Sequence, residues 1–266
     1  MANTQNMTVG KPARLLFFFA LPLMFSNMFQ QLYTVVDTAI VGRGVGMDAL
    51  AALGTVDWLS WMVLGIAQGF TAGFSVRMSQ KFGEGDVPGL RRVIGLSARL
   101  TVFITLLTAV LSQVALPGFL YLLRVPAELS PMATLYVRIL FAGTPCMMFF
   151  NFTASTLRAV GNSKTPLFAM ITASVLNIAL DALTVFILHW GIAGAAGATV
   201  FAQAVAGGIC AYRIAKTPHL HFRLSDMARD GAMEKSLMGL GTPLAIQNTI
   251  ISIGGMVVSA VVNGFG

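Results

Sequence analysis

The first chemical feature of the sequence is an acid inside an apolar stretch. Residues 174–190 read SVLNIALDALTVFILHW, so Asn177 and Asp181 lie in a run that is otherwise almost wholly apolar. A spacing of four residues places both side chains on one face of a helix, one turn apart. Carboxylate and amide oxygens are ligands that hard cations prefer, and a proton would also suit a weakly solvated carboxylate. The pair indicates a site for Na+ or for H+, between which the sequence does not choose.

The composition is that of a membrane protein. Apolar residues make up 56% of the chain, charged residues 10%, and the mean hydropathy is +0.78. Seven stretches are long enough to cross a hydrocarbon core of about 30 Å, which takes ~20 helical residues. Runs such as LLFFFALPLMF do not alternate in polarity, which argues against a β-barrel. We predict an all-α polytopic membrane protein with spans at 15–41, 50–78, 93–116, 131–156, 166–189, 192–214 and 238–263.

The basic residues gather in alternate loops. Most of them precede the first predicted span or follow the second, fourth and sixth, whereas the intervening loops hold only Arg43 and Arg124. By the positive-inside rule the amino terminus is cytoplasmic. This sorting explains the net charge of +7 without a nucleic-acid partner. The first apolar run is too long for a cleavable signal, so we expect a multi-pass protein of the plasma membrane, the inner membrane of a bacterium.

The last predicted span resembles the first. Aligning LPLMFSNMFQQLYTVVDTAIVGRGVG with TPLAIQNTIISIGGMVVSAVVNGFG pairs Pro22 with Pro243 and Asn27 with Asn248, 221 residues apart. The alternative is coincidence between two apolar segments. Transporters are often built from two such halves, so we expect a longer protein whose second lobe is mostly missing here. The predicted parts are a cytoplasmic amino-terminal segment (1–14), a six-helix lobe (15–214), a cytoplasmic linker (215–236) and the first helix of a second lobe (237–266).

Three acids lie within predicted spans, namely Asp37, Asp57 and Asp181. A charged acid at the centre of a membrane helix costs ~2.5–3.5 kcal/mol, so such residues usually face a cavity and act there. At ~1.5 Å per residue, Asp37, Asp181 and Thr199 all lie ~8–12 Å below the outer surface, where they can share one chamber. Asp57 lies nearer the outer mouth, beside Trp58, and its role is left open.

Two structural roles compete with a cation site. Asn177 and Asp181 can hydrogen-bond to each other and fix helix packing, or Arg138, at a similar depth, can neutralise an acid. Arg138 is two residues from Tyr136, so the two side chains point in roughly opposite directions on a helix and only one faces a given chamber.

Other residues have a simpler interpretation as packing residues. Gly65, Gly69 and Gly73, at four-residue spacing, predict close contact between the second span and another helix. Cys146 and Cys210 lie in predicted spans and lack the spacing of a metal site, so we interpret them as packing residues rather than as a disulfide or metal pair.

Longer motifs resemble a known family. PLMFSNMFQQLYTVVDTAIVGRGVGMDALAALG, GEGDVPGLRR, RAVGNSKTP and the pair NIALD and GIAGAAGATVFAQ are together similar to the multidrug and toxic compound extrusion (MATE) transporters, from about Lys11 onward. The resemblance implies a twelve-helix exporter of two six-helix lobes. It implies that a Na+ or H+ gradient, with no other cofactor, drives the export of cationic or amphipathic organic compounds by alternating access.

The resemblance also implies roles for residues. It assigns cation coupling, as Na+ or H+, to Asp37, Asn177, Asp181 and Thr199, the substrate cavity to Gln30, Tyr33, Tyr136 and Asn151, and a helix bend to Pro22. Asp57 is not part of the family pattern. Tyr33, four residues before Asp37, can stack on an organic cation or simply pack against a helix. Membrane helices tolerate proline, so Pro22 need not be a gate.

We therefore expect a cation-coupled multidrug antiporter and not an enzyme. One alternative is a lipid-linked precursor flippase of the same broad superfamily, which would need a more cationic cavity. Another is an intramembrane enzyme, which would need a His, Ser or metal constellation at membrane depth. The three histidines, His189, His219 and His221, fall at span ends or in the linker.

Overall fold

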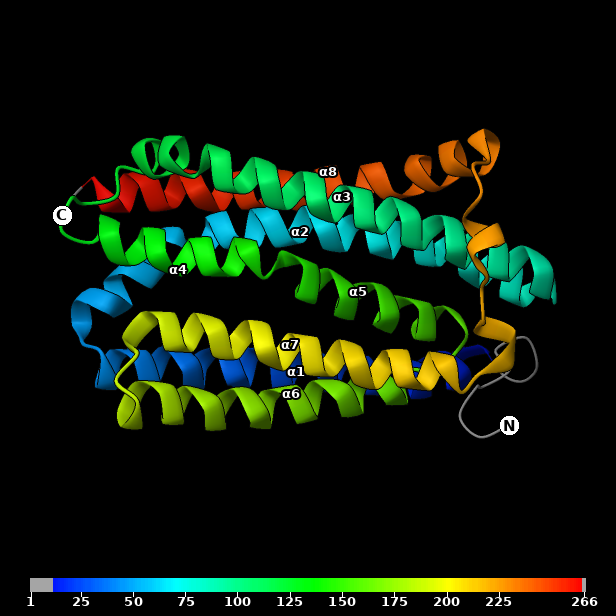
Figure 1. Ribbon diagram of the computed structural model, residues 1–266, viewed down its shortest axis with the longest axis horizontal. Helices are drawn as coiled ribbons and strands as arrows, with labels where there is room; N and C mark the ends of the chain where they lie inside the picture. The colour runs from blue at the N-terminus through cyan, green and yellow to red at the C-terminus, as the bar shows by residue number, and fades with distance from the viewer. Residues whose placement is uncertain (1–11, 265–266) are drawn as a thin grey trace.

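The computed structural model describes residues 12–264 as a bundle of long helices that run roughly side by side (Figure 1). Six helices are long and apolar enough to span a membrane, or seven if one bent pair counts as a single span. This confirms the predicted all-α polytopic fold. Of the predicted amino-terminal segment, residues 1–11 lie outside the described part of the chain. The long helices are α1 (Pro12–Gly44), α2 (Met47–Gly83), α3 (Val87–Leu122), α4 (Ser130–Ala142), α5 (Thr144–Ala159), α6 (Lys164–Ala182), α7 (Gly191–Ala215) and α8 (Gly231–Asn263).

The fourth predicted span is two helices rather than one. α4 and α5 meet at Gly143 and are bent by 45°, so the span predicted for 131–156 corresponds to this bent pair and not to one straight helix. Pro145 has no amide hydrogen to donate, and it disfavours helical geometry at the residue before it. A Cβ at Gly143 would lie 2.1 Å from a methyl carbon of Val200 in α7. The break therefore also lets the chain approach α7 closely.

The glycine ladder of α2 contacts α8. A Cβ at Gly69 would lie 2.5 Å from the backbone of Ala245, and one at Gly73 would lie 2.3 Å from the Cα of Gly241. Beside them, Asn248 donates a 2.8 Å hydrogen bond to the Gly65 carbonyl. The prediction of close helix contact is confirmed, and the last span, which resembles the first in sequence, lies directly against α2.

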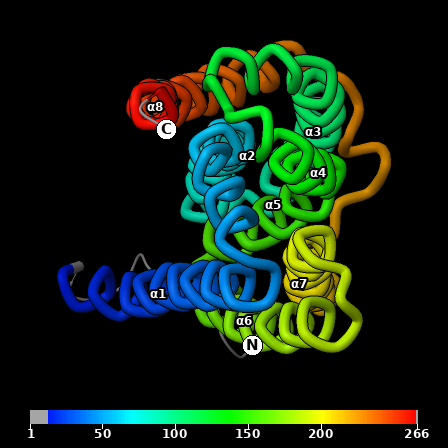
Figure 2. The backbone as a smooth tube through the Cα atoms, turned by 90° about the vertical axis from the view of Figure 1, so that its left-hand side faces the viewer, coloured from blue at the N-terminus to red at the C-terminus, as the bar shows by residue number. Residues whose placement is uncertain are grey.

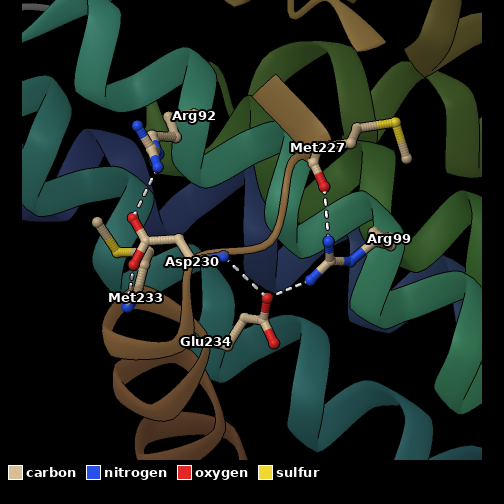
Figure 3. A network of polar contacts seen from close by, with 6 residues as sticks. All are labelled: Arg92, Arg99, Met227, Asp230, Met233 and Glu234. Atoms are coloured by element: carbon tan, nitrogen blue, oxygen red, sulfur yellow. Dashed lines mark hydrogen bonds and ion pairs between the residues drawn. The ribbon is translucent and has the colours of Figure 1, made fainter. Parts of the chain in front are cut away.

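The segment 216–230 joins α7 to α8 across one end of the bundle, which we call the linker end (Figure 1). Figure 3 shows how it is held: Arg99 pairs with Glu234 and donates to the Met227 carbonyl at 2.7 Å, and Arg92 pairs with Asp230 at 3.0 Å. The carboxylate of Asp230 also accepts a hydrogen bond from the Met233 amide and so caps α8. α8 consequently begins at Gly231, earlier than the predicted start at 238.

Replacement of Gly69 by leucine tests the α2–α8 contact. We expect Gly69→Leu to destabilise the full-length protein by about 1–3 kcal/mol or more, because the new side chain meets backbone that cannot rotate away. Gly208→Leu is the matched control, since nothing lies within 4 Å of a Cβ at that exposed position of α7. Melting temperatures measured in detergent by fluorescence-detected gel filtration compare the two, and equal values would contradict the contact.

Candidate functional site

A cavity of about 390 Å³ lies between α1 and the rest of the bundle. Residues of α1, α2, α4, α5, α6 and α7 form its wall. Viewed from the end opposite the linker, α1 and α8 extend away from the bundle on the same side, with α2 between them (Figure 2). All four residues assigned to a substrate cavity line this wall, together with two of those assigned to cation coupling; the six are Gln30, Tyr33, Asp37, Tyr136, Asn151 and Thr199.

The four residues assigned to cation coupling come together at one side of the cavity. Asp37 and Thr199 lie on the wall, and Asn177 and Asp181 lie behind it, 1% and 0% exposed. The carboxyl groups of Asp37 and Asp181 are neighbours. The Asn177 amide donates to the Thr199 hydroxyl at 3.3 Å. We call these four residues the acidic chamber.

The chamber exists because α6 packs between α1 and α7. The Ser174 hydroxyl reaches the Phe29 carbonyl of α1 at 3.4 Å, one turn before Asn177 on α6. Beyond Asp181 the helix widens into a π-turn over Leu183–Ile187. Such turns are frequent at functional sites, because they shift the register of the side chains around them. The helical spacing of α6 thus directs both polar side chains to the seam with its neighbours.

The oxygens of the chamber lack partners. Both carboxylate oxygens of Asp181, one of Asp37 and the amide oxygen of Asn177 are buried without a hydrogen bond from any residue in the range 12–264. Within that range neither acid pairs with a lysine or arginine. An unsatisfied buried polar group costs ~1–3 kcal/mol, and more when it is charged. Four converging oxygens fit a hard cation, and a proton shared between the two acids would also satisfy part of the set.

The structure disfavours both competing roles. Asn177 donates to Thr199, and Asp181 receives no hydrogen bond from it, so the two do not form the packing pair considered above. Arg138 is exposed and lies off the cavity wall, whereas Tyr136 is on the wall. Arg138 therefore does not neutralise either acid, and the opposite directions expected for the two side chains of α4 are confirmed.

Further polar residues line the cavity, among them two charged side chains and a buried amide. Asp57, whose role the sequence left open, is exposed to it, and Gln203 is buried beside it. Gln203 lies four residues after Thr199, so helical spacing alone would have placed it on the same face. Arg158 also lines the cavity and donates to the Ser155 hydroxyl at 2.7 Å. The sequence placed Arg158 in the loop after the span predicted to end at 156, whereas α5 continues to Ala159 and so includes Arg158.

The proline assigned to a helix bend does not interrupt α1, which is continuous from Pro12 to Gly44. Proline leaves the carbonyl four residues earlier without its usual donor. The Ser26 hydroxyl bonds to the Pro22 carbonyl at 2.9 Å and supports the next turn. A bend at Pro22 remains a prediction.

Among the described residues that line the cavity there is no histidine or cysteine. His219 and His221 lie in the linker, and His189 is exposed beyond the end of α6. Cys146 and Cys210 are free thiols, so they form no disulfide with each other. Among residues 12–264 no three side chains of His, Cys, Asp or Glu cluster as a metal site would require.

With this geometry established, comparisons identify the family. The profile described as MatE matches residues 22–183, which is more than half of the chain. A probable multidrug resistance protein of Bacillus subtilis, YpnP, is 30% identical over 269 residues, 98% of this chain and 58% of its own length. The chain belongs to the MatE family, which is a family of transporters and not of enzymes, and it spans a little more than half the length of this relative.

Solved structures agree with the fold. An outward-facing structure of a multidrug resistance MATE family transporter of the MOP superfamily superposes with a TM-score of 0.85 at 26% identity, covering 92% of this chain and 54% of that one. An inward-facing structure of such a transporter gives 0.78 at 25% identity, with 92% and 60% covered. The helices described here are thus arranged as in such transporters, with the higher score for the outward-facing form.

Removing the charge at Asp181 separates a cation site from a packing role. In alkaline buffer without Na+, Asp181→Asn should raise the melting temperature of the full-length protein, because an amide can donate to Asp37 where two unpartnered carboxylates now meet. The expected gain is on the order of 1–3 kcal/mol. Asp57→Asn, at an exposed acid of the same cavity, should change the melting temperature little. A clear loss of stability in Asp181→Asn alone would indicate that the acid serves packing.

Proposed function

We propose that the full-length protein is a cation-coupled multidrug exporter. The single observation that carries this proposal is the acidic chamber, whose buried, unpartnered oxygens lie beside a cavity in a bundle of MATE transporter fold. The name of the Bacillus subtilis relative and the titles of the solved structures support multidrug transport as the activity. The coupling ion is Na+ or H+, since the four residues offer oxygen ligands to the first and two carboxylates to the second.

The charge distribution of the cavity favours organic cations as substrates. Asp37 and Asp57 line it towards the end of the bundle opposite the linker, and among its described lining residues Arg158, near the linker end, is the single lysine or arginine. Tyr33 and Tyr136 line the same space and offer aromatic faces to a cation. A lipid-linked precursor flippase would carry a polyanionic headgroup, for which two acids against one arginine is a poor match.

Coupling follows from linkage between the chamber and the cavity. An ion that binds the chamber more tightly in one arrangement of the helices shifts the protein towards that arrangement. Because Asp37 belongs to both the chamber and the cavity wall, ion binding there competes with or repositions a cationic substrate. Coupling free energies of this kind correspond to about 5- to 150-fold changes in affinity. In the proposed orientation the linker end faces the cytoplasm of a bacterium, as the basic loops indicate.

Transport by everted vesicles that carry the full-length chain tests this function. We expect a fluorescent organic cation to accumulate in response to an imposed Na+ or H+ gradient, and the gradient that drives it identifies the ion. Asp37→Asn and Asp181→Asn should each lower gradient-driven uptake at least about tenfold, within the range of known coupling energies. Arg138→Gln, at an exposed position off the cavity, is the control and should transport normally.

The variants also define what would contradict the proposal. Unchanged uptake in either acid variant, at equal amounts of protein in the membrane, would remove the chamber from the coupling mechanism. If no organic cation accumulated in response to a gradient and a lipid-linked precursor was transported instead, the flippase would be favoured.

A further inference from the structure

A second hollow, of about 740 Å³, lies between α3, α5, α7 and residues 220–222 of the linker. We call it the lateral groove. Its lining is almost wholly apolar, with His221 at one end as the one titratable side chain among the residues that form it. The large apolar side chains that shape it are Val102, Leu106, Phe149, Phe152, Ile214 and Phe222.

The lateral groove opens towards lipid. Val102, Leu106 and Phe149 on its edges are 56%, 57% and 44% exposed, which for membrane-spanning helices means contact with acyl chains. Water gains little by entering an apolar hollow at this depth, because it would leave its hydrogen bonds unmade. An acyl chain would restore the dispersion contacts that an empty groove forfeits. The apolar lining of the groove and its opening to the bilayer thus favour a lipid acyl chain as its occupant.

The groove and the cavity lie on different sides of the bundle. α1 and α8 extend to one side in Figure 2, whereas α3, α7 and the linker lie on the other. The cavity wall carries Asp37, Asp57 and Arg158, which cannot face hydrocarbon cheaply and therefore belong against the rest of a longer protein. The apolar groove can contact hydrocarbon without this cost, so it lies on the side of the bundle that faces lipid.

The rim of the groove at the linker end is basic. Lys216 follows the lining residue Ala215, Arg223 follows the lining residue Phe222, and both are exposed. Two nearby acids, Asp230 and Glu234, pair with arginines of α3, whereas Asp226 accepts from the backbone amide of Arg223 and keeps its charge. Lys216 and Arg223 together outnumber that acid, so the net charge at the rim is positive and complements an anionic phosphate.

An unpartnered hydroxyl lies in the groove near its linker end. Arg99 is the last charged residue of α3 before the uncharged remainder of the helix, and it binds the linker and the start of α8. Thr101 is two residues further along α3, ~3 Å deeper, and lines the groove. Its hydroxyl oxygen is buried, with the side chain 6% exposed, and has no partner among the residues of the described range. It is placed to donate to an ester or phosphate oxygen.

We propose that the lateral groove binds one anionic glycerophospholipid of the surrounding bilayer. One acyl chain lies between α3, α5 and α7, an ester oxygen accepts from Thr101, and the phosphate lies at Lys216 and Arg223. Because the linker also holds the start of α8, a lipid seated there fastens the connection between α7 and α8. This site is independent of transport, and its existence does not rest on the proposed function.

Native mass spectrometry of the full-length protein tests the site. The purified protein is incubated with phosphatidylglycerol or with phosphatidylcholine of identical chains, and the lipid that stays bound under increasing collision energy is counted. We expect one phosphatidylglycerol to be retained on the order of tenfold more than phosphatidylcholine, since each basic residue near a membrane surface favours anionic lipid. The same lipid should raise the melting temperature of the protein.

Two kinds of variant locate the lipid. Ala98→Phe with Ala211→Phe fills the groove from two walls and should abolish retention of the lipid. Lys216→Gln with Arg223→Gln changes exposed residues only, so it keeps the fold and should remove the preference for the anionic headgroup. The matched controls are Val175→Phe on the exposed face of α6 and Lys235→Gln on α8, both of which should bind as the unchanged protein does.

Three outcomes would overturn the proposal. Retention of phosphatidylglycerol by the filled variant would place the lipid elsewhere, and equal retention of the two lipids by the unchanged protein would exclude headgroup recognition. Displacement of the lipid by a fluorescent organic cation, lost in the filled variant, would make the groove a second drug site instead.

Discussion

The structure depends on one constraint, which is that polar groups inside a bilayer must be satisfied by the protein or by something it binds. Asp181 is fully buried on a helix whose neighbouring residues are apolar, and both of its carboxylate oxygens lack a donor within the described chain. A protein keeps so costly a group in place only where something else balances the cost. Because α6 packs between α1 and α7, Asp37 and Thr199 lie at the same point as Asp181. A bound cation or proton at this point would offset the cost of burying the acid.

The same constraint gives the bundle two different sides. Polar residues of α1 and α2 line the cavity, where contact with hydrocarbon would be costly. On the other side, α3, α5 and α7 present exposed apolar residues and an apolar groove, which the bilayer itself can fill. The bundle therefore has one side with a polar cavity and one apolar side that suits contact with lipid.

α8 connects these features. It has backbone contact with α2 at Gly69 and Gly73, and the hydrogen bond from Asn248 fixes its register along that helix. Ion pairs from Arg92 and Arg99 hold its first turn to α3. Movement of α8 relative to the helices before it would have to break these contacts together, so α2, α3 and α8 are expected to move as a unit. The site on α6 and α7 lies outside this unit.

The sequence alone determined that the protein lies in a lipid bilayer, that it is helical, and that Asn177 and Asp181 share one face of α6, because hydropathy and helical spacing are local properties. Depth counting along straight spans also grouped Asp37, Asp181 and Thr199, which the structure places at one side of the cavity. Counting along straight spans did not anticipate the bend at Gly143, next to Pro145 and Val200, or the position of Arg158 on the cavity wall. Tertiary packing decided three further features, because each depends on neighbours that are distant in the chain. These features are the set of oxygens that lack hydrogen-bond partners, the helix that contacts the glycine ladder, and the direction of Arg138 away from the cavity.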